Sequence, residues 1–341
     1  MQKGKTSKIR EFLVRAVADG QRSPTSLAAK HFGITRQAAN WHLRNLVKEG
    51  LVVASGRTRA RTYGLVAIVE KEHTVPLGPH LEEHRVWKNC FSDALADMSQ
   101  NVLEICEYGL TEILNNAKDH SGGGVAKVSL RITAADIQIT VRDDGIGIFR
   151  KIKEGLGLSD EREAILELAK GKITTDPSRH TGEGIFFTSR MFDEFCILSR
   201  HLFFSHKDMR GDWLVEALES EDQGTFVTMR IDRASARTMK GVYDRYASEA
   251  NDFAFTRTRL AVRLLRIGKE SLVSRSQAKR LLARLDRFEE VVLDFDGIDS
   301  IGQAFADEIF RVFQNEHPEV RLIPVNESPE VARMIRRATG S

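Results

Sequence analysis

The spacing of hydrophobic residues divides the first 66 residues into three helices and a hairpin. Apolar side chains recur at helical intervals over residues 7–18, 24–33 and 35–50, which predicts one helix in each range. Ser23 followed by Pro24 is a typical helix start, with a capping side chain and a proline in the first turn. Short apolar stretches at 51–54 and 62–65 flank a basic segment, which predicts a two-stranded hairpin with a basic tip.

The rest of the chain alternates between predicted helices and strands. Residues 81–120 have a helical pattern, and Ile137, Ile139 and Val141 alternate with polar residues as in a strand with one buried face. Beyond a charged helical connector near residue 250, strands at 291–295 and 320–325 alternate with helices at 305–313 and after Ser328. We therefore predict a multidomain α/β protein. Its expected parts are an N-terminal domain (1–66), a linker (67–82), a central α/β sandwich domain (83–235), a connector (236–265) and a small α/β domain (266–341).

The number and spacing of the cysteines indicate that the protein occurs in a reducing compartment. The three cysteines, Cys90, Cys106 and Cys196, have no paired spacing, so a disulfide framework is not expected. The first eight residues lack the apolar segment of a secretory signal, and no apolar run approaches the length of a membrane span. We therefore expect a cytoplasmic protein that does not use a membrane as a partner.

Positive charge is concentrated at the N-terminal end. Residues 1–65 contain 13 Lys and Arg against 3 Asp and Glu, a net charge of +10, so the remainder carries −7 of the total of +3. A strongly basic domain on a weakly acidic body predicts contact with nucleic acid at one end of the chain.

Three helices followed by a basic hairpin resemble a winged helix-turn-helix. The resemblance implies a third helix that enters the major groove of double-stranded DNA and a wing that contacts phosphate or the minor groove. The alternative is a module that binds protein or dimerises, with its charge on a solvated face. The residues expected to contact DNA are Thr35, Arg36, Gln37, Asn40, Trp41, Arg44, Arg57, Arg59 and Arg61.

A carboxylate and a carboxamide share one face of the helix that is predicted to end near residue 120. Glu112 and Asn116 are four residues apart, and Asp119 and His120 extend the same face by another turn. The amide oxygen of Asn116 suits a hard cation that takes oxygen ligands, and Glu112 can orient or deprotonate a nucleophile. The pair therefore suits a metal-bound triphosphate.

A second carboxylate, Asp143, ends the strand at 137–143 on its apolar side. A buried carboxylate needs a hydrogen-bond partner, and the amino group of a purine is a suitable one. Gly145 and Gly147 follow directly and let the backbone turn sharply and approach a ligand. Gly182 and Gly184 precede another predicted helix, whose free N–H groups can bind phosphate.

In this order, the motifs resemble the Bergerat-fold ATPase superfamily, which includes histidine kinases, gyrase-type topoisomerases, heat-shock chaperones of that fold and anti-sigma-factor kinases. The resemblance implies that ATP and Mg²⁺ bind, with Asn116 at the magnesium, Asp143 at the adenine amino group and Glu112 as the general base. Glu112 resembles the hydrolases and the anti-sigma kinases, which carry Glu where histidine kinases usually carry Asn, and His120 after Asn116 resembles the anti-sigma kinases most closely. By the same resemblance, the further ATP-binding residues are Asp119, His120, Gly145, Gly147, Ile148, Arg179, His180, Gly182, Glu183, Gly184 and Thr225.

Each motif has a simpler interpretation when it is taken alone. Asp-Asp-Gly is most often a turn, and Asn116 could merely end a helix. The segment 149–180 is rich in Lys and Arg and is expected to close over the triphosphate, but an ordinary solvated loop and helix would have the same composition. The correct order of four motifs, each on a suitable element, favours the nucleotide site.

The last quarter of the chain resembles STAS domains, the fold of the anti-anti-sigma factors that anti-sigma kinases phosphorylate. In those substrates a phosphorylated serine opens the helix after the strand. Gln303 and Ala304 take that place here, and Ser300 lies earlier, in the loop. The phosphate acceptor is therefore missing, which argues against phosphorylation of the protein's own tail.

These features predict an ATP-binding regulator that binds double-stranded DNA. Mg-ATP would act as a conformational switch with slow hydrolysis, because a ligand that prefers one of two forms shifts their populations. The STAS-like tail would sense that state or dock to a protein partner, and a homodimer through this tail or the ATPase domain is an alternative. A different hypothesis is a protein Ser/Thr kinase of the anti-sigma type that acts on a separate STAS or sigma-like protein. A third is a degenerate ATPase that serves as a scaffold.

Overall fold

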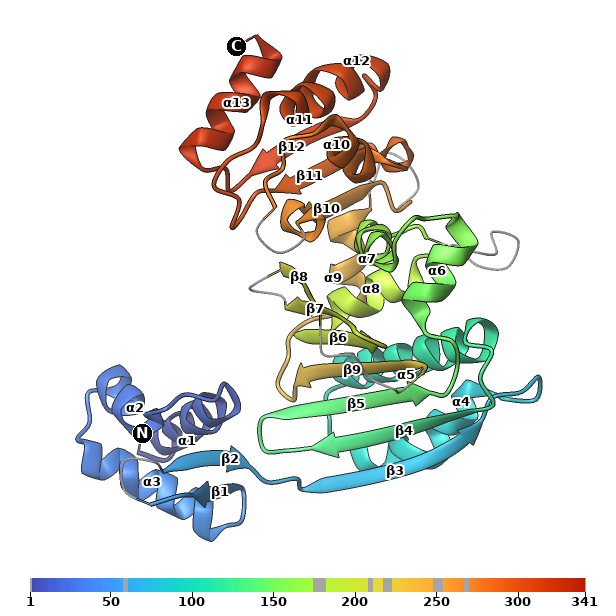
Figure 1. Cartoon of the computed structure of the whole chain (residues 1–341). Coiled ribbons are helices and arrows are strands. Elements are labelled where there is room, and N and C mark those ends of the chain that lie inside the picture. The colour runs from blue at the N-terminus through green and yellow to red at the C-terminus, as the bar shows by residue number, and fades with distance from the viewer. Residues whose placement is uncertain are drawn as a thin grey trace.

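The structure is a computed structural model that describes residues 2–57, 61–173, 182–207, 211–216, 223–247, 254–266 and 270–340. It has three parts: an N-terminal helical part beside one end of a large sheet, the central sheet with its helices, and a C-terminal α/β part near the opposite edge of the sheet (Figure 1). The predicted multidomain α/β fold class is confirmed. No helix in these described ranges combines the length and the apolar character needed to cross a membrane.

The N-terminal part contains the three predicted helices and the predicted hairpin. Ile9, Leu13, Leu43 and Leu46 form its core. This core extends to Ala135 in the turn between two strands of the central sheet, so the N-terminal part packs against the sheet. Its elements are α1 (Gln2–Ala18), α2 (Pro24–Phe32), α3 (Arg36–Lys48), β1 (Val52–Ser55) and β2 (Thr62–Leu65), with β1 and β2 antiparallel.

The central sheet has seven strands in the order β3-β4-β5-β9-β6-β7-β8, and every neighbouring pair is antiparallel. Along β4 and β9 buried residues alternate with more exposed ones, because one face of the sheet packs on helices. The strands are β3 (Val69–Pro76), β4 (Val125–Ile132), β5 (Asp136–Asp143), β6 (Glu194–Ser199), β7 (Leu202–Lys207), β8 (Gly211–Glu216) and β9 (Thr225–Asp232).

The linker predicted over residues 67–82 is wrong for half of its length, because Val69–Pro76 form β3. The prediction rested on two prolines and a glycine. However, β3 is the outermost strand of the sheet and Pro76 is its last residue, and a proline is tolerated there because no neighbouring strand needs its N–H. The central domain therefore begins at least 14 residues before position 83.

Helices cover one face of this sheet, and α5 is the longest of them. Its buried residues, which include Ile105, Leu110, Ile113 and Ala117, recur every three or four positions and pack toward the strands. Glu112 and Asn116 are half-buried and lie at the margin of this buried face, next to Ile113 and Ala117. The helices of this part are α4 (Glu83–Val86), α5 (Gln100–His120), α6 (Ile148–Leu156), α7 (Glu161–Lys170), α8 (Gly184–Met191) and α9 (Met239–Tyr246).

The C-terminal part is a parallel sheet of three strands with helices, as the alternation of predicted elements indicated. Its strands lie in the order β10-β11-β12, and Ser328 caps the last helix by accepting a hydrogen bond from Val331 N–H at 3.2 Å. The elements are β10 (Arg257–Ala261), α10 (Arg275–Leu282), β11 (Glu290–Asp294), α11 (Gln303–Asp307), a π-helical continuation (Glu308–Phe313), α12 (Gln314–Glu316), β12 (Arg321–Val325) and α13 (Pro329–Thr339).

The connector predicted over residues 236–265 is also wrong in part. Its helical character agrees with α9, but it also contains the whole of β10, which pairs in parallel with β11. The strand is only five residues long and includes two arginines, so its pattern gave little indication of burial, but Leu260 is completely buried. The buried residues of the central and C-terminal parts form one continuous hydrophobic cluster, which joins the two parts firmly.

Candidate functional site

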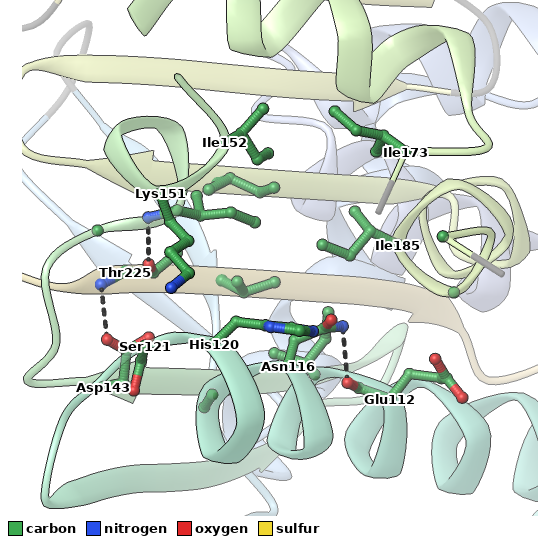
Figure 2. A pocket seen from close by; sticks show the side chains of 18 residues that line it. Glu112, Asn116, His120, Ser121, Asp143, Lys151, Ile152, Ile173, Ile185 and Thr225 are labelled. Carbon is green, nitrogen blue, oxygen red and sulfur yellow. Dashed lines mark hydrogen bonds between the residues drawn. The ribbon is translucent and has the colours of Figure 1, made fainter. Parts of the chain in front are cut away.

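A cavity of about 330 Å³ lies between α5, the ends of β5 and β9, and the first turns of α6 and α8 (Figure 2). Residues from at least five separate segments of the sequence meet there. The predicted site residues that line it are Glu112, Asn116, His120, Asp143, Gly147, Ile148, Gly182, Gly184 and Thr225. The fold thus brings the three predicted motifs and Thr225 to one place.

The side chains of α5 form one wall of the cavity. Glu112, Asn116 and His120 lie on successive turns of this helix, as their spacing predicted (Figure 2). The Nδ2 group of Asn116 donates to the backbone oxygen of Glu112 at 2.8 Å. With its amino group used in this way, Asn116 can offer its Oδ1 oxygen to a cation.

The carboxylate of Glu112 packs against the start of α8. A side chain added at Gly184 would place its Cβ 2.0 Å from Oε2 of Glu112, so only glycine permits this approach. The first turn of α8 also has backbone N–H groups that have no partner within the helix. An acidic group and the N-terminus of a helix are therefore neighbours at this end of the cavity.

Asp143 and Thr225 form the other end of the site. Asp143 is 6% exposed, and its Oδ1 accepts hydrogen bonds from the N–H groups of Gly145 at 2.9 Å and Thr225 at 3.3 Å. Burial raises the pKa of Asp143, and the hydrogen bonds from Gly145 and Thr225 oppose that rise. The hydroxyl oxygen of Thr225 in turn accepts from Ile148 N–H at 3.0 Å, which fixes the start of α6.

Gly147 is needed for the turn from β5 into α6. Its φ of 91° lies in the region that favours glycine, and a Cβ there would come within 2.5 Å of the Ser199 hydroxyl. The turn directs α6 so that Lys151 and Ile152 line the cavity. Lys151 was not among the predicted site residues, although its spacing of three from Ile148 on an amphipathic helix could have indicated it.

Some predicted residues do not line the cavity. Asp119 is exposed on the last turn of α5 and does not line the cavity. Gly145 supports the site indirectly, through its hydrogen bond to Asp143. Glu183 lies just before α8, where burial raises its pKa, but it is not part of the lining. Arg179 and His180 lie outside the described residues.

Comparison with known protein families agrees with this geometry. Residues 106–235 match the family described as histidine kinase-, DNA gyrase B-, and HSP90-like ATPase. The central domain is an ATPase domain of this type. Residues 277–332 match a STAS-like domain of unknown function. No curated protein matches the chain.

The cavity of the ATPase domain fits a nucleotide. Ile113, Ile152, Ile173, Ile185, Ile197 and Val227 supply an apolar lining for a base. The buried carboxylate of Asp143 can accept a hydrogen bond from an amino group on that base, and the first turn of α8 can receive phosphate. The match supports ATP binding, and the lining residues are of the kinds that such binding needs.

The donor set for Mg²⁺ is small. The described residues contain no group of three or more His, Cys, Asp or Glu side chains arranged to hold a metal ion. This fits an ion that is held mainly by nucleotide phosphates with one protein oxygen, for which Asn116 is placed. When bound, Mg²⁺ would neutralise charge on the phosphates.

We expect Asn116→Ala to reduce the dependence of ATP binding on Mg²⁺. The variant removes the amide oxygen and leaves the neighbouring wall of α5 intact. The ratio of the ATP dissociation constant without Mg²⁺ to that with Mg²⁺ should fall by about ten-fold. This is the effect expected when one contact to a charged group is lost that is about as strong as a hydrogen bond. Asn115→Ala, one residue earlier on α5, is the matched control. An unchanged ratio in Asn116→Ala would contradict the assigned metal role.

Proposed function

We propose that the protein is an ATP-dependent regulator that binds DNA through its N-terminal domain and uses Mg-ATP binding, with slow hydrolysis, as a switch. The proposal rests mainly on one observation, the meeting of Asp143, Asn116 and Glu112 around a single cavity. The STAS-like domain would respond to the nucleotide state or dock to a partner protein. A regulator of this kind needs ATP to bind one conformation better than another.

The residues of the cavity suggest how ATP is held and cleaved. Asp143 would accept a hydrogen bond from the adenine amino group, because its carboxylate faces an apolar cavity from a buried position. Lys151 would pair with phosphate oxygens. Glu112 would take a proton from the attacking water, and its place beside the start of α8 puts it near the phosphate end of the nucleotide.

The exposed face of α3 supports DNA binding. Thr35 caps this helix by accepting a hydrogen bond from Ala38 N–H at 3.1 Å, so its hydroxyl is engaged in the helix. Arg36, Gln37 and Arg44 are exposed, as is Trp41 at 60%. Asn40 is half-buried. Arg57 and Arg61 on the wing are exposed, whereas Arg59 lies outside the described residues.

We expect Arg36→Ala and Arg44→Ala each to weaken binding to a random-sequence DNA duplex. Each arginine that contacts phosphate releases about one counterion, so the slope of log K against log salt should fall by about one per variant. Lys240→Ala is the control, since Lys240 is exposed on α9 and pairs with Asp244 at 2.6 Å. Binding that stays unchanged at low salt in both arginine variants would favour a protein-binding module.

The fate of the γ-phosphate tests the chemical part of the proposal. We expect incubation with γ-labelled ATP to release free labelled phosphate slowly. Transfer of the label to an added STAS-domain protein would instead favour the protein kinase hypothesis. Absence of both products would leave a nucleotide-binding scaffold and contradict the proposed hydrolysis.

A further inference from the structure

The C-terminal part meets the ATPase domain in two different ways. Near β8 and α9 a polar cavity of about 640 Å³ lies between the two parts, with Arg245, Arg259 and Asp294 among its lining residues. At its edge the parts touch, since Arg263 Nε donates to the backbone oxygen of Asp212 on β8 at 2.8 Å. Near α7 they are in close contact. Of these contacts, the one at α7 is the better route for transmitting a change, because the chain that follows α7 reaches the nucleotide cavity at Ile173.

Lys170, the last residue of α7, is the centre of this contact. It is 1% exposed. Its Nζ donates to Glu167 Oε1 at 2.6 Å and to the backbone oxygens of Arg280 at 3.1 Å and Ala283 at 2.8 Å. The three N–H donors of the ammonium group thus have three partners, two of which belong to the C-terminal part.

Other bonds surround this lysine. Arg284 pairs with Glu167 at 3.1 Å, so the carboxylate of Glu167 is held from both sides of the contact. Arg280 pairs with Glu163 of α7 at 3.5 Å. The hydroxyl of Thr258 on β10 donates to the backbone oxygen of Lys170 at 2.7 Å. The end of α7 is therefore fixed to the C-terminal part through both its side chains and its backbone.

Three residues lead from Lys170 to the nucleotide cavity. Gly171 packs closely on Phe255, since an added Cβ would lie 2.8 Å from that ring. Lys172 donates to the backbone oxygen of Arg287 at 3.0 Å and lies over the ring of Phe288. Ile173 lines the cavity, and its N–H donates to the oxygen of Gly182, which also lines it, at 3.1 Å.

We propose that Lys170 is a positioning residue through which the STAS-like domain controls the nucleotide cavity. The domain holds the end of α7, and α7 sets the positions of Ile173 and Gly182 in the cavity wall. Holding this wall in place lowers the ordering cost of nucleotide binding. By reciprocity, ATP must then stabilise the contact between α7 and the STAS-like domain. The inference rests on the proposed function only in that ATP is the ligand of the cavity.

Lys170→Met tests this role without leaving an isolated buried charge. Methionine fills much of the same space, and Glu167 keeps its pairing with Arg284. We expect the dissociation constant for ATP to rise by at least about five-fold, the lower end of typical coupling between sites. Lys279→Met is the matched control on α10. The Lys279 side chain is 70% exposed and pairs with Glu308 at 3.7 Å, so the ATP affinity of this variant should match that of the parent protein.

Hydrogen exchange distinguishes a positioning role of Lys170 from a purely structural one, because only a positioning role couples exchange in the STAS-like domain to ATP binding. In the parent protein, ATP should slow amide exchange in residues 277–288, which do not line the nucleotide cavity. This response should be lost in Lys170→Met and retained in Lys279→Met. Should Lys170→Met fail to fold, Thr258→Val removes only the hydroxyl bond to the Lys170 backbone and should give a smaller change in the same direction.

The possible outcomes separate the two proposals. If the parent protein binds ATP while Lys170→Met, or Thr258→Val in its place, keeps full affinity and the full exchange response, the positioning role is wrong and the ATP-binding proposal stands. If the parent protein binds no ATP, both proposals fail.

Discussion

Asp143→Asn is expected to weaken ATP binding by about ten- to hundred-fold. The Oδ1 atom of Asp143 accepts hydrogen bonds from Gly145 N–H and Thr225 N–H. An asparagine would keep its oxygen toward these donors and would therefore turn its NH₂ group toward the cavity. A donor would then face the adenine amino group, which is itself a donor. The loss of one hydrogen bond to a charged acceptor is worth about 1.5–3 kcal/mol, and calorimetric titration with ATP measures it.

Asp144→Asn is the matched control for this prediction. Asp144 is exposed and its Oδ1 accepts from Gly124 N–H at 2.8 Å and Val125 N–H at 3.0 Å, outside the cavity. An asparagine oxygen can keep both bonds, so ATP affinity should remain that of the parent protein. Equal affinities in Asp143→Asn and Asp144→Asn would show that Asp143 does not contact the base.

Glu112→Gln is expected to reduce phosphate release from ATP by at least about 100-fold while ATP affinity changes little. Glutamine has nearly the same shape as glutamate, so its fit beside Gly184 is preserved. It cannot accept the proton of the attacking water, and a general base typically contributes about 10²–10⁴-fold to a rate. Single-turnover release of labelled phosphate measures the effect, and titration with ATP measures affinity separately.

Glu107→Gln provides the comparison on the same helix. Glu107 contacts His84 at 3.0 Å and does not line the cavity, so its variant should hydrolyse ATP at the parent rate. An unchanged rate in Glu112→Gln would remove the general-base assignment. A loss of binding equal to the loss of rate would instead show that Glu112 mainly maintains the shape of the cavity beside α8.

The candidate site could be predicted from the sequence to a large extent because its motifs are local. Glu112 and Asn116 lie on one helix, and Asp143 lies at the end of one strand, so the spacing along the chain gives their direction directly. The same reasoning gave the helices and hairpin of the N-terminal part and the later elements of the C-terminal part. Gln303, which takes the place of the STAS phosphate acceptor, is indeed the first residue of α11.

Features that depend on contacts between distant residues could not be predicted in this way. The sequence of β3 does not by itself indicate a strand, and the strand is evident only from its pairing with β4. The same is true of β10, which pairs with β11. Lys170 and Lys172 belonged to a basic segment expected to close over the triphosphate. Both instead bond to backbone oxygens of the C-terminal part, from residues more than 100 positions away in the sequence. Composition alone does not distinguish these two uses of a lysine.

The most direct test of the account is calorimetric titration of the full chain with a non-hydrolysable ATP analogue, with Mg²⁺ and with a chelator. We predict one saturable site per chain that binds more tightly with Mg²⁺ and is weakened by Asp143→Asn. The absence of binding heat at every Mg²⁺ concentration and at two temperatures would contradict the central claim that Mg-ATP occupies the cavity between α5 and β5.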